Sequence, residues 1–135
     1  MRKLGLTIIL LSLAACGGSG GNPNSPSQQP VSQTISGTVG VFGDTVHAIS
    51  ASRSGTMTLT LQWTNNSVDL DLYLVNSSCN PAISLATCQD LGHADGFVNP
   101  EVVTRTVSQG ESFQAVVDNQ SLTQSANYTI TVRIQ

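Results

Sequence analysis

The fold is decided by the stretch GTMTLTLQWTNNSVDLDLYLV, Gly55 to Val75. Its first half alternates apolar residues with Thr and Gln, and its second half alternates leucines with Asp and Tyr. Successive side chains of a β-strand point to opposite faces, so this period of two predicts two strands, each with one buried face. The polar sequence TNNS between them predicts a turn. The expected buried faces consist of Met57, Leu59, Leu61 and Trp63 on the first strand, and Leu70, Leu72 and Leu74 on the second.

The same alternation continues through the rest of the chain. It is clear in ESFQAVVD and in NYTITVRI, and shorter strands are expected at 34–40, 45–50 and 102–107. Turn sequences rich in Gly, Asn, Pro and Ser separate these segments, and no segment has a helical stripe of apolar residues. Seven or so short strands with one apolar face each predict an all-β protein, an antiparallel β-sandwich. A small barrel is the alternative.

The start of the chain resembles the signal peptide of bacterial lipoprotein precursors. Arg2 and Lys3 precede an apolar run, and the sequence LAAC ends at Cys16. The resemblance implies that residues 1–15 are removed, that Cys16 receives lipid, and that the protein is anchored to a membrane in the bacterial cell envelope. In bacteria with an outer membrane, Asp directly after this Cys retains a lipoprotein at the inner membrane. Gly17 therefore favours the outer membrane for a Gram-negative source.

The segment after Cys16 consists mainly of Gly, Ser, Asn, Pro and Gln. Such a composition cannot bury enough apolar surface to fold, so residues 16–33 are expected to be a lipidated Cys followed by a flexible tether. Residues 34–135 then form one domain. Removal of the signal peptide leaves three cations against eight acids, a formal net charge of −5. The lack of a basic patch argues against nucleic acid as a partner.

Cys79 and Cys88 remain once Cys16 is assigned to lipid. In an exported chain they are expected to form a disulfide that closes a loop of roughly ten residues, worth about 2.5–3 kcal/mol. The alternative is a pair of metal ligands. The spacing is not that of a zinc site and no further Cys is available, which makes the disulfide the stronger interpretation.

Most of the predicted domain resembles the bacterial pre-peptidase C-terminal domain. The similar segments are GTMTLTLQWTNNSVDLDLYLV, NPEVVTRTVSQGESFQAVVDN and ANYTITV. Phe113 stands where that family usually has Tyr, and the Cys79–Cys88 loop is not one of its hallmarks. The resemblance implies a jelly-roll sandwich of about seven or eight strands, exported and without catalysis of its own. Some relatives bind calcium and some bind extracellular polymers. The matching residues are Asp69, Asp71, Leu72, Tyr73, Leu74, Glu101, Gly110, Phe113, Tyr128 and Thr129.

Asp69 and Asp71 raise a question, because Asp is disfavoured in strands. With the leucines inward, both carboxylates are expected on the solvent-exposed face, where they repel each other. Water and a cross-strand pair with Arg105 or Arg133 could offset that repulsion. A calcium ion could do the same, and no other cofactor is expected. Calcium needs six or more oxygens, for which the candidates are Asp69, Asp71, Asp90, Asp95 and Glu101.

Asp90, His93 and Asp95 are also spaced like ligands of a transition metal, although most loop histidines are simply solvated. The sequence contains no nucleophile elbow, zinc-protease motif or phosphate-binding loop, so no enzyme activity is expected. Among the aromatic residues, Trp63 is expected in the core. Tyr73 lies on the opposite face of its strand and is the better candidate for a binding surface.

These observations favour a lipid-anchored, noncatalytic binding module for an extracellular polymer or an envelope protein, with calcium as a potential stabiliser. The alternative is an accessory lipoprotein that stabilises a separately encoded secreted hydrolase.

Overall fold

The computed structural model describes residues 29–81 and 84–135. The predicted signal peptide, Cys16 and most of the predicted tether lie outside the described residues. Within the described part, no helix is long and apolar enough to cross a membrane. The elements are eight strands and one short 3₁₀ helix: β1 (Val31–Val39), β2 (Gly43–Ser50), β3 (Gly55–Trp63), β4 (Leu70–Asn76), η1 (Leu85–Thr87), β5 (Asp90–Ala94), β6 (Glu101–Val107), β7 (Ser112–Asn119) and β8 (Ala126–Ile134).

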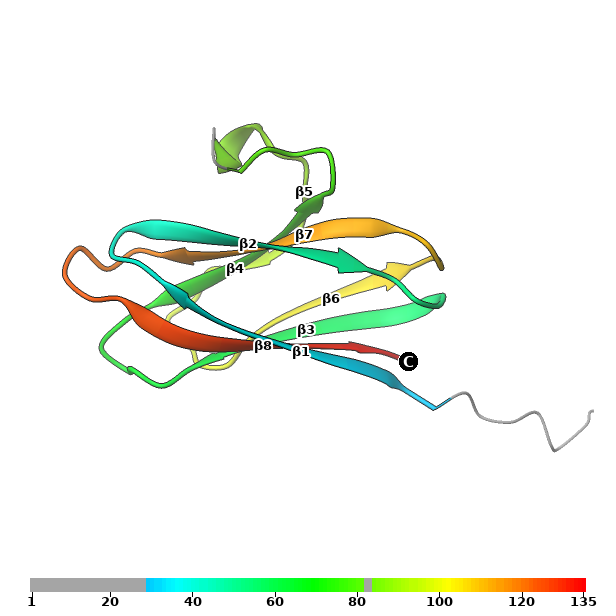
Figure 1. The fold of residues 1–135 in the computed structure, drawn as a ribbon, viewed down its shortest axis with the longest axis horizontal. Helices are drawn as coiled ribbons and strands as arrows, with labels where there is room; N and C mark the ends of the chain where they lie inside the picture. The colour runs from blue at the N-terminus through cyan, green and yellow to red at the C-terminus, as the bar shows by residue number, and fades with distance from the viewer. Residues whose placement is uncertain (1–28, 82–83) are drawn as a thin grey trace, which may run out of the picture.

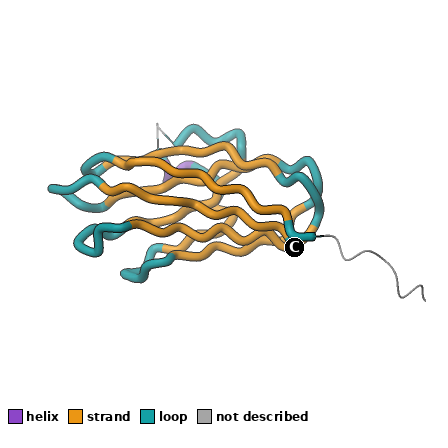
Figure 2. Tube along the Cα trace, turned by 60° about the horizontal axis from the view of Figure 1, so that its bottom comes forward, coloured by secondary structure: helices purple, strands orange, loops and turns teal. Residues whose placement is uncertain are grey.

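The strands form two four-stranded antiparallel sheets packed face to face (Figure 1). One sheet has the order β1-β8-β3-β6 and the other β2-β7-β4-β5. Consecutive strands therefore lie in different sheets, except that β4 and β5 are neighbours in one sheet, which is the connectivity of a jelly roll. The tube in Figure 2 shows the strands running lengthwise, with the connecting loops gathered at the two ends. The predicted β-sandwich of jelly-roll type is confirmed.

The core lies between the sheets and comes from the predicted alternation. Met57, Leu59 and Leu61 of β3 are fully buried, as are the three leucines of β4. Trp63 is also buried, and its indole N–H donates to the carbonyl of Val68 at 2.7 Å. That bond satisfies the polar end of the ring and fixes the turn into β4. The core assignment of Trp63 is confirmed.

The largest differences from the sequence-based expectation concern β1 and β5. β1 begins at Val31, three residues before the predicted domain start, because residues 31–33 pair through their backbone with the end of β8. Their side chains are exposed, so no alternation marks them. β5 was not predicted. It is a five-residue strand at a sheet edge, half-buried and interrupted by Gly92, and such a strand has little periodicity.

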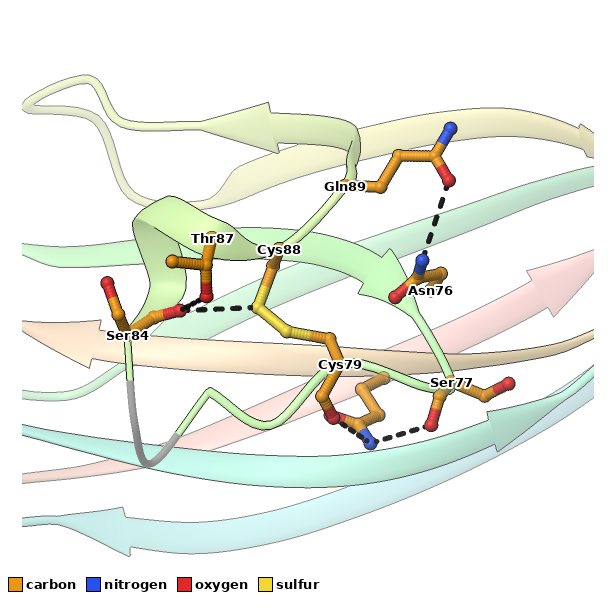
Figure 3. Close-up of a disulfide and its surroundings, with 8 residues drawn as sticks. Asn76, Ser77, Cys79, Ser84, Thr87, Cys88 and Gln89 are labelled. Carbon is orange, nitrogen blue, oxygen red and sulfur yellow. Dashed lines mark hydrogen bonds between the residues drawn. A yellow bond between two sulfur atoms is a disulfide. The ribbon is translucent and has the colours of Figure 1, made fainter.

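The connection from β4 to β5 carries the predicted disulfide, which is confirmed: Cys79 and Cys88 are bonded, with their Cα atoms 5.3 Å apart. Figure 3 shows η1 leading directly into Cys88. The Gln114 side chain, from β7, donates to the carbonyls of Ser77 and Cys79 at 3.2 and 3.1 Å. These bonds hold the disulfide loop against the sheet, and in Figure 1 the loop stands over the β2-β7-β4-β5 layer.

Candidate functional site

Four aspartates lie side by side across the outer face of the β2-β7-β4-β5 sheet. Asp118 of β7 is paired with Asp44 of β2 on one side and with Asp71 of β4 on the other. The β4–β5 register pairs Leu72 with Ala94, and its continuation by one residue places Asp95 opposite Asp71. We call Asp44, Asp118, Asp71 and Asp95 the aspartate row. Like charges in directly opposed positions are destabilising, so the row is an electrostatic cost to the fold.

Asp71 points away from the leucines, as predicted, but the expectation that it is solvent-exposed is wrong. The residue is only 6% exposed. Burial raises the pKa of Asp71 to about 6, and repulsion from Asp69 and Asp95 adds to the shift. Burial likewise raises the pKa of Asp118 to about 6, with a contribution from Asp44. Gln120 donates a hydrogen bond to Asp118. The outer face of this sheet is therefore partly shielded from solvent.

The predicted cross-strand pairs with arginine are wrong for the described residues. Arg105 belongs to β6 of the other sheet, and its side chain donates to the carbonyl of Leu91 in β5 at 3.1 Å and lies over the ring of Phe113 in β7. Arg133 is on β8 of that same sheet. The one ion pair in the described part of the chain joins His93 Nδ1 to Asp90 Oδ2 at 2.6 Å. The aspartate row thus lacks a cationic partner within residues 29–81 and 84–135.

Glu101 has a structural role that sequence reasoning missed. It is 1% exposed and faces the interior from the start of β6. Its two carboxylate oxygens accept the backbone N–H groups of Leu72 at 2.8 Å and Gly96 at 3.0 Å. Burial raises the pKa of Glu101 to about 7 in spite of these two donors. Glu101 therefore joins the two sheets by supplying acceptors for backbone amides that would otherwise be unpaired.

The five residues predicted as calcium ligands do not converge. Asp69, Asp71 and Asp95 are close enough for the first and third to raise the pKa of Asp71, but Glu101 is already used by backbone donors. Asp90 is bonded to His93 and to the amide of Gly92. Among the described residues, no three His, Cys, Asp or Glu side chains are arranged to hold a metal ion. This geometry supports neither the calcium set nor the alternative set of Asp90, His93 and Asp95.

Tyr73, the predicted binding residue, is half-buried on the outer face of β4, with its ring 5.9 Å from that of His93. Both belong to a cavity of about 430 Å³ beneath the disulfide loop. The other lining residues are Val75, Leu85, Ala86, Cys88, Asp90 and Asp95. We call this cavity the loop pocket. Burial, together with the charge of Asp71, raises the pKa of Tyr73 to about 12, so its hydroxyl stays neutral.

A second candidate surface lies at one end of the other sheet and was not predicted. A cleft of about 780 Å³ runs over the ends of β1, β3 and β8. The only ionisable group in its lining is the phenol of Tyr128. The lining residues are Ser36, Gly37, Thr38, Gln62, Trp63, Thr64, Asn99, Asn127, Tyr128 and Thr129. A smaller hollow of about 430 Å³ shares Trp63 and Asn99 with this cleft and adds Asp69 and Phe97. We call the two together the amide cleft.

Internal hydrogen bonds fix the polar groups of the amide cleft. The Asn99 side chain donates to the carbonyl of Trp63 at 2.7 Å, and the Asn127 side-chain oxygen accepts from the Thr38 hydroxyl at 2.6 Å. Each amide thereby keeps its other end available, an acceptor on Asn99 and a donor on Asn127. A ligand would meet groups already held in place, which lowers the entropy lost on binding.

Phe97 lies at the rim of the amide cleft and is 93% exposed. The ring is the most exposed large apolar side chain of the described residues. The sequence carries a signal for this surface, because Phe97 and Val98 are apolar residues between the turn sequences ADG and NP. Large apolar residues in a predicted turn are not expected to be buried in the core, so they are candidates for a binding surface.

Comparison with solved structures finds similar folds of bacterial origin. A mitogen derived from Yersinia pseudotuberculosis has a TM-score of 0.58 at 19% identity, covering 79% of this chain and 88% of the mitogen chain. PliG of Aeromonas hydrophila, a periplasmic inhibitor of g-type lysozyme, has a TM-score of 0.54 at 13% identity, covering 77% of this chain and 86% of PliG. At such identities the similarity shows the fold alone.

No family model and no curated protein matches the chain. The resemblances to lipoprotein precursors and to the pre-peptidase C-terminal domain therefore stay predictions, and so does the lipidation of Cys16. The β-sandwich architecture does not depend on them, because it follows from the strand pairings and is shared with the solved structures.

Proposed function

We propose that this protein is a noncatalytic binding module of the bacterial envelope, lipid-anchored through Cys16, whose amide cleft binds a neutral polysaccharide. The feature that carries the proposal is the composition of the cleft: amides and hydroxyls along its length and an exposed aromatic ring at its rim. A role in the envelope is compatible with the periplasmic location of PliG, which has a similar fold.

The chemistry of the cleft matches that of a sugar chain. Neutral sugars present many hydroxyls and few charges, and amide and hydroxyl side chains bond to them without the cost of burying a charge. Sugar rings also have apolar faces, which pack on exposed aromatic side chains such as Phe97. Asp69, in the smaller hollow, adds one acceptor for a sugar hydroxyl.

Binding of the full chain, kept in mild detergent, to insoluble cellulose, chitin and peptidoglycan tests the proposal. We expect one of these polymers to retain the protein, and Phe97→Ala to weaken retention about tenfold, the loss of one stacking contact. Gln62→Ala, inside the cleft, should weaken it less, by the loss of a single neutral hydrogen bond. Phe42→Ala is the matched control, since Phe42 is 68% exposed but lines neither part of the cleft. Equal losses from Phe97→Ala and Phe42→Ala, or no retention on any of the polymers, would contradict the proposal.

The second candidate is an accessory protein that binds a separately encoded secreted hydrolase. The acidic outer face of the β2-β7-β4-β5 sheet favours this candidate, because an uncompensated negative surface attracts a basic protein. Copurification of a hydrolase with the protein from envelope extracts, with no retention on any polymer, would support this candidate over the first.

A further inference from the structure

The loop pocket is separate from the amide cleft and shares no lining residue with it. It opens on the opposite sheet, between β4, β5 and the disulfide loop. An inference drawn from it therefore goes beyond the proposed polysaccharide binding and does not depend on it.

One side of the pocket is apolar. This side is lined by Val75 of β4, which is buried on the outer face of its sheet, by Leu85 and Ala86 of η1, and by Cys88 of the disulfide. These groups offer no strong hydrogen bond. Only an aliphatic or aromatic part of a ligand gains by contacting them.

The other side presents acceptors and negative charge. Asp90 accepts the Nδ1–H of His93, and this hydrogen bond raises the pKa of the imidazole above its ordinary value. Asp95 is exposed directly after β5. The neighbouring Asp71 and Asp118 extend the negative charge across the sheet. Within the described residues, none of the arginines lines this pocket.

We propose that the loop pocket receives an arginine side chain of a partner protein. The aliphatic stem of arginine would lie along Val75, Leu85 and Ala86, and the guanidinium would reach the carboxylates of Asp95 and Asp90. Its planar cation also fits beside the ring of Tyr73. Arginine combines an apolar stem, a flat cation and several fixed donors, which is the combination that these two sides of the pocket require.

A titration with blocked tripeptides tests this proposal on the isotope-labelled full chain in mild detergent. We expect acetyl-Gly-Arg-Gly-amide to cause saturable NMR shifts at the amides of Gly92, His93 and Ala94 below about 10 mM, a normal affinity for one isolated side chain. The same peptide with citrulline, which has the shape of arginine without its charge, should bind at least about fivefold more weakly.

Two variants locate the contact. Asp95→Asn removes a charge within the pocket and should weaken the arginine peptide about fivefold. Asp44→Asn removes a charge at the far end of the aspartate row, outside the pocket, and should change affinity less than twofold. Spectra unchanged away from the substitution show that each variant is folded.

Several results would overturn the proposal. Equal weakening by Asp95→Asn and Asp44→Asn would show general attraction to an acidic surface. Equal binding of the citrulline peptide, or of a lysine peptide, would show that the pocket does not select arginine. Absence of saturable shifts at β5 would show that the pocket is not a site for the side chain.

Discussion

The two outer faces of the sandwich have the same strand geometry and opposite environments. On the β1-β8-β3-β6 sheet, Thr34, Thr131 and Thr60 lie in one row, and Ser36, Thr129 and Gln62 in the next. We call this the hydroxyl face. Its side chains are exposed or half-buried and need no protein partner because water satisfies them. On the other sheet, the outward-facing Val75 and Val116 are almost completely buried.

The disulfide loop contributes to this difference at Val75. It is held to the β2-β7-β4-β5 sheet by Gln114, and its residues Leu85, Ala86 and Cys88 share the loop pocket with Val75. The hydroxyl face has no comparable covering among the described residues. Whether an outward-facing side chain of a sandwich is buried or solvent-exposed therefore depends on what packs over its sheet.

The largest effect should come from placing a charge on each face. Val116→Asp introduces a carboxylate at a fully buried outer position and should cost at least about 3 kcal/mol, the penalty for a buried unpaired charge. Thr131→Asp, on the central strand of the hydroxyl face, should cost about 1 kcal/mol or less. Urea unfolding measures both. Similar costs for the two variants would mean that the faces do not differ in burial.

The next largest effect should follow loss of the disulfide. Cys79→Ala combined with Cys88→Ala releases the loop and should lower the free energy of unfolding by about 2.5–3 kcal/mol. The reduced wild-type protein provides the control, because it should lose a similar amount without a change of sequence. Thermal melts with and without reductant measure this. If the double variant and the reduced wild-type protein each lost less than about 1 kcal/mol of unfolding free energy, the disulfide would not have the expected stabilising role.

A smaller effect should appear in the pH dependence of stability. Asp71 and Asp118, with a folded pKa of about 6, and Glu101, with one of about 7, bind protons more tightly in the folded state than in the unfolded state. Stability should therefore fall as pH rises from about 4.5 to 7.5, and the melting temperature should be roughly 5 °C higher near pH 5.5 than near pH 7.5.

Asp118→Asn should raise stability at pH 7.5 and reduce this pH dependence, since it removes the central charge of the aspartate row. Glu111→Gln, at an exposed carboxylate outside the row that only accepts the backbone N–H of Ser108, serves as the control and should leave the slope nearly unchanged. A melting temperature that rises steadily between pH 5 and 7.5 would show that the row is not held at raised pKa values.

The smallest effect should come from calcium. Without three converging ligands, calcium should act only by screening the aspartate row, so calcium and magnesium at equal concentration should raise the melting temperature equally and by no more than about 2 °C. A larger shift that is specific to calcium and reversed by chelator would restore the calcium hypothesis.

The candidate sites were only partly visible in the sequence. Tyr73 and Asp69 were singled out, and each lines one of the two surfaces described here. The cleft that Phe97, Asn99 and Asn127 line was not visible, because these residues come from separate segments that the strand pairing brings to one end of the sandwich. Glu101 was assigned to calcium because its backbone partners, Leu72 and Gly96, could not be known without the fold.

The sequence by itself determined every strand except β5, the buried faces and the disulfide, because alternation and cysteine spacing can be read directly from the chain. It also determined that Asp71 points away from the leucines. The tertiary structure alone decided that Asp71 is buried and that four aspartates lie in one row. Strand register and loop packing join residues far apart in the chain, and neither leaves a mark in the local pattern.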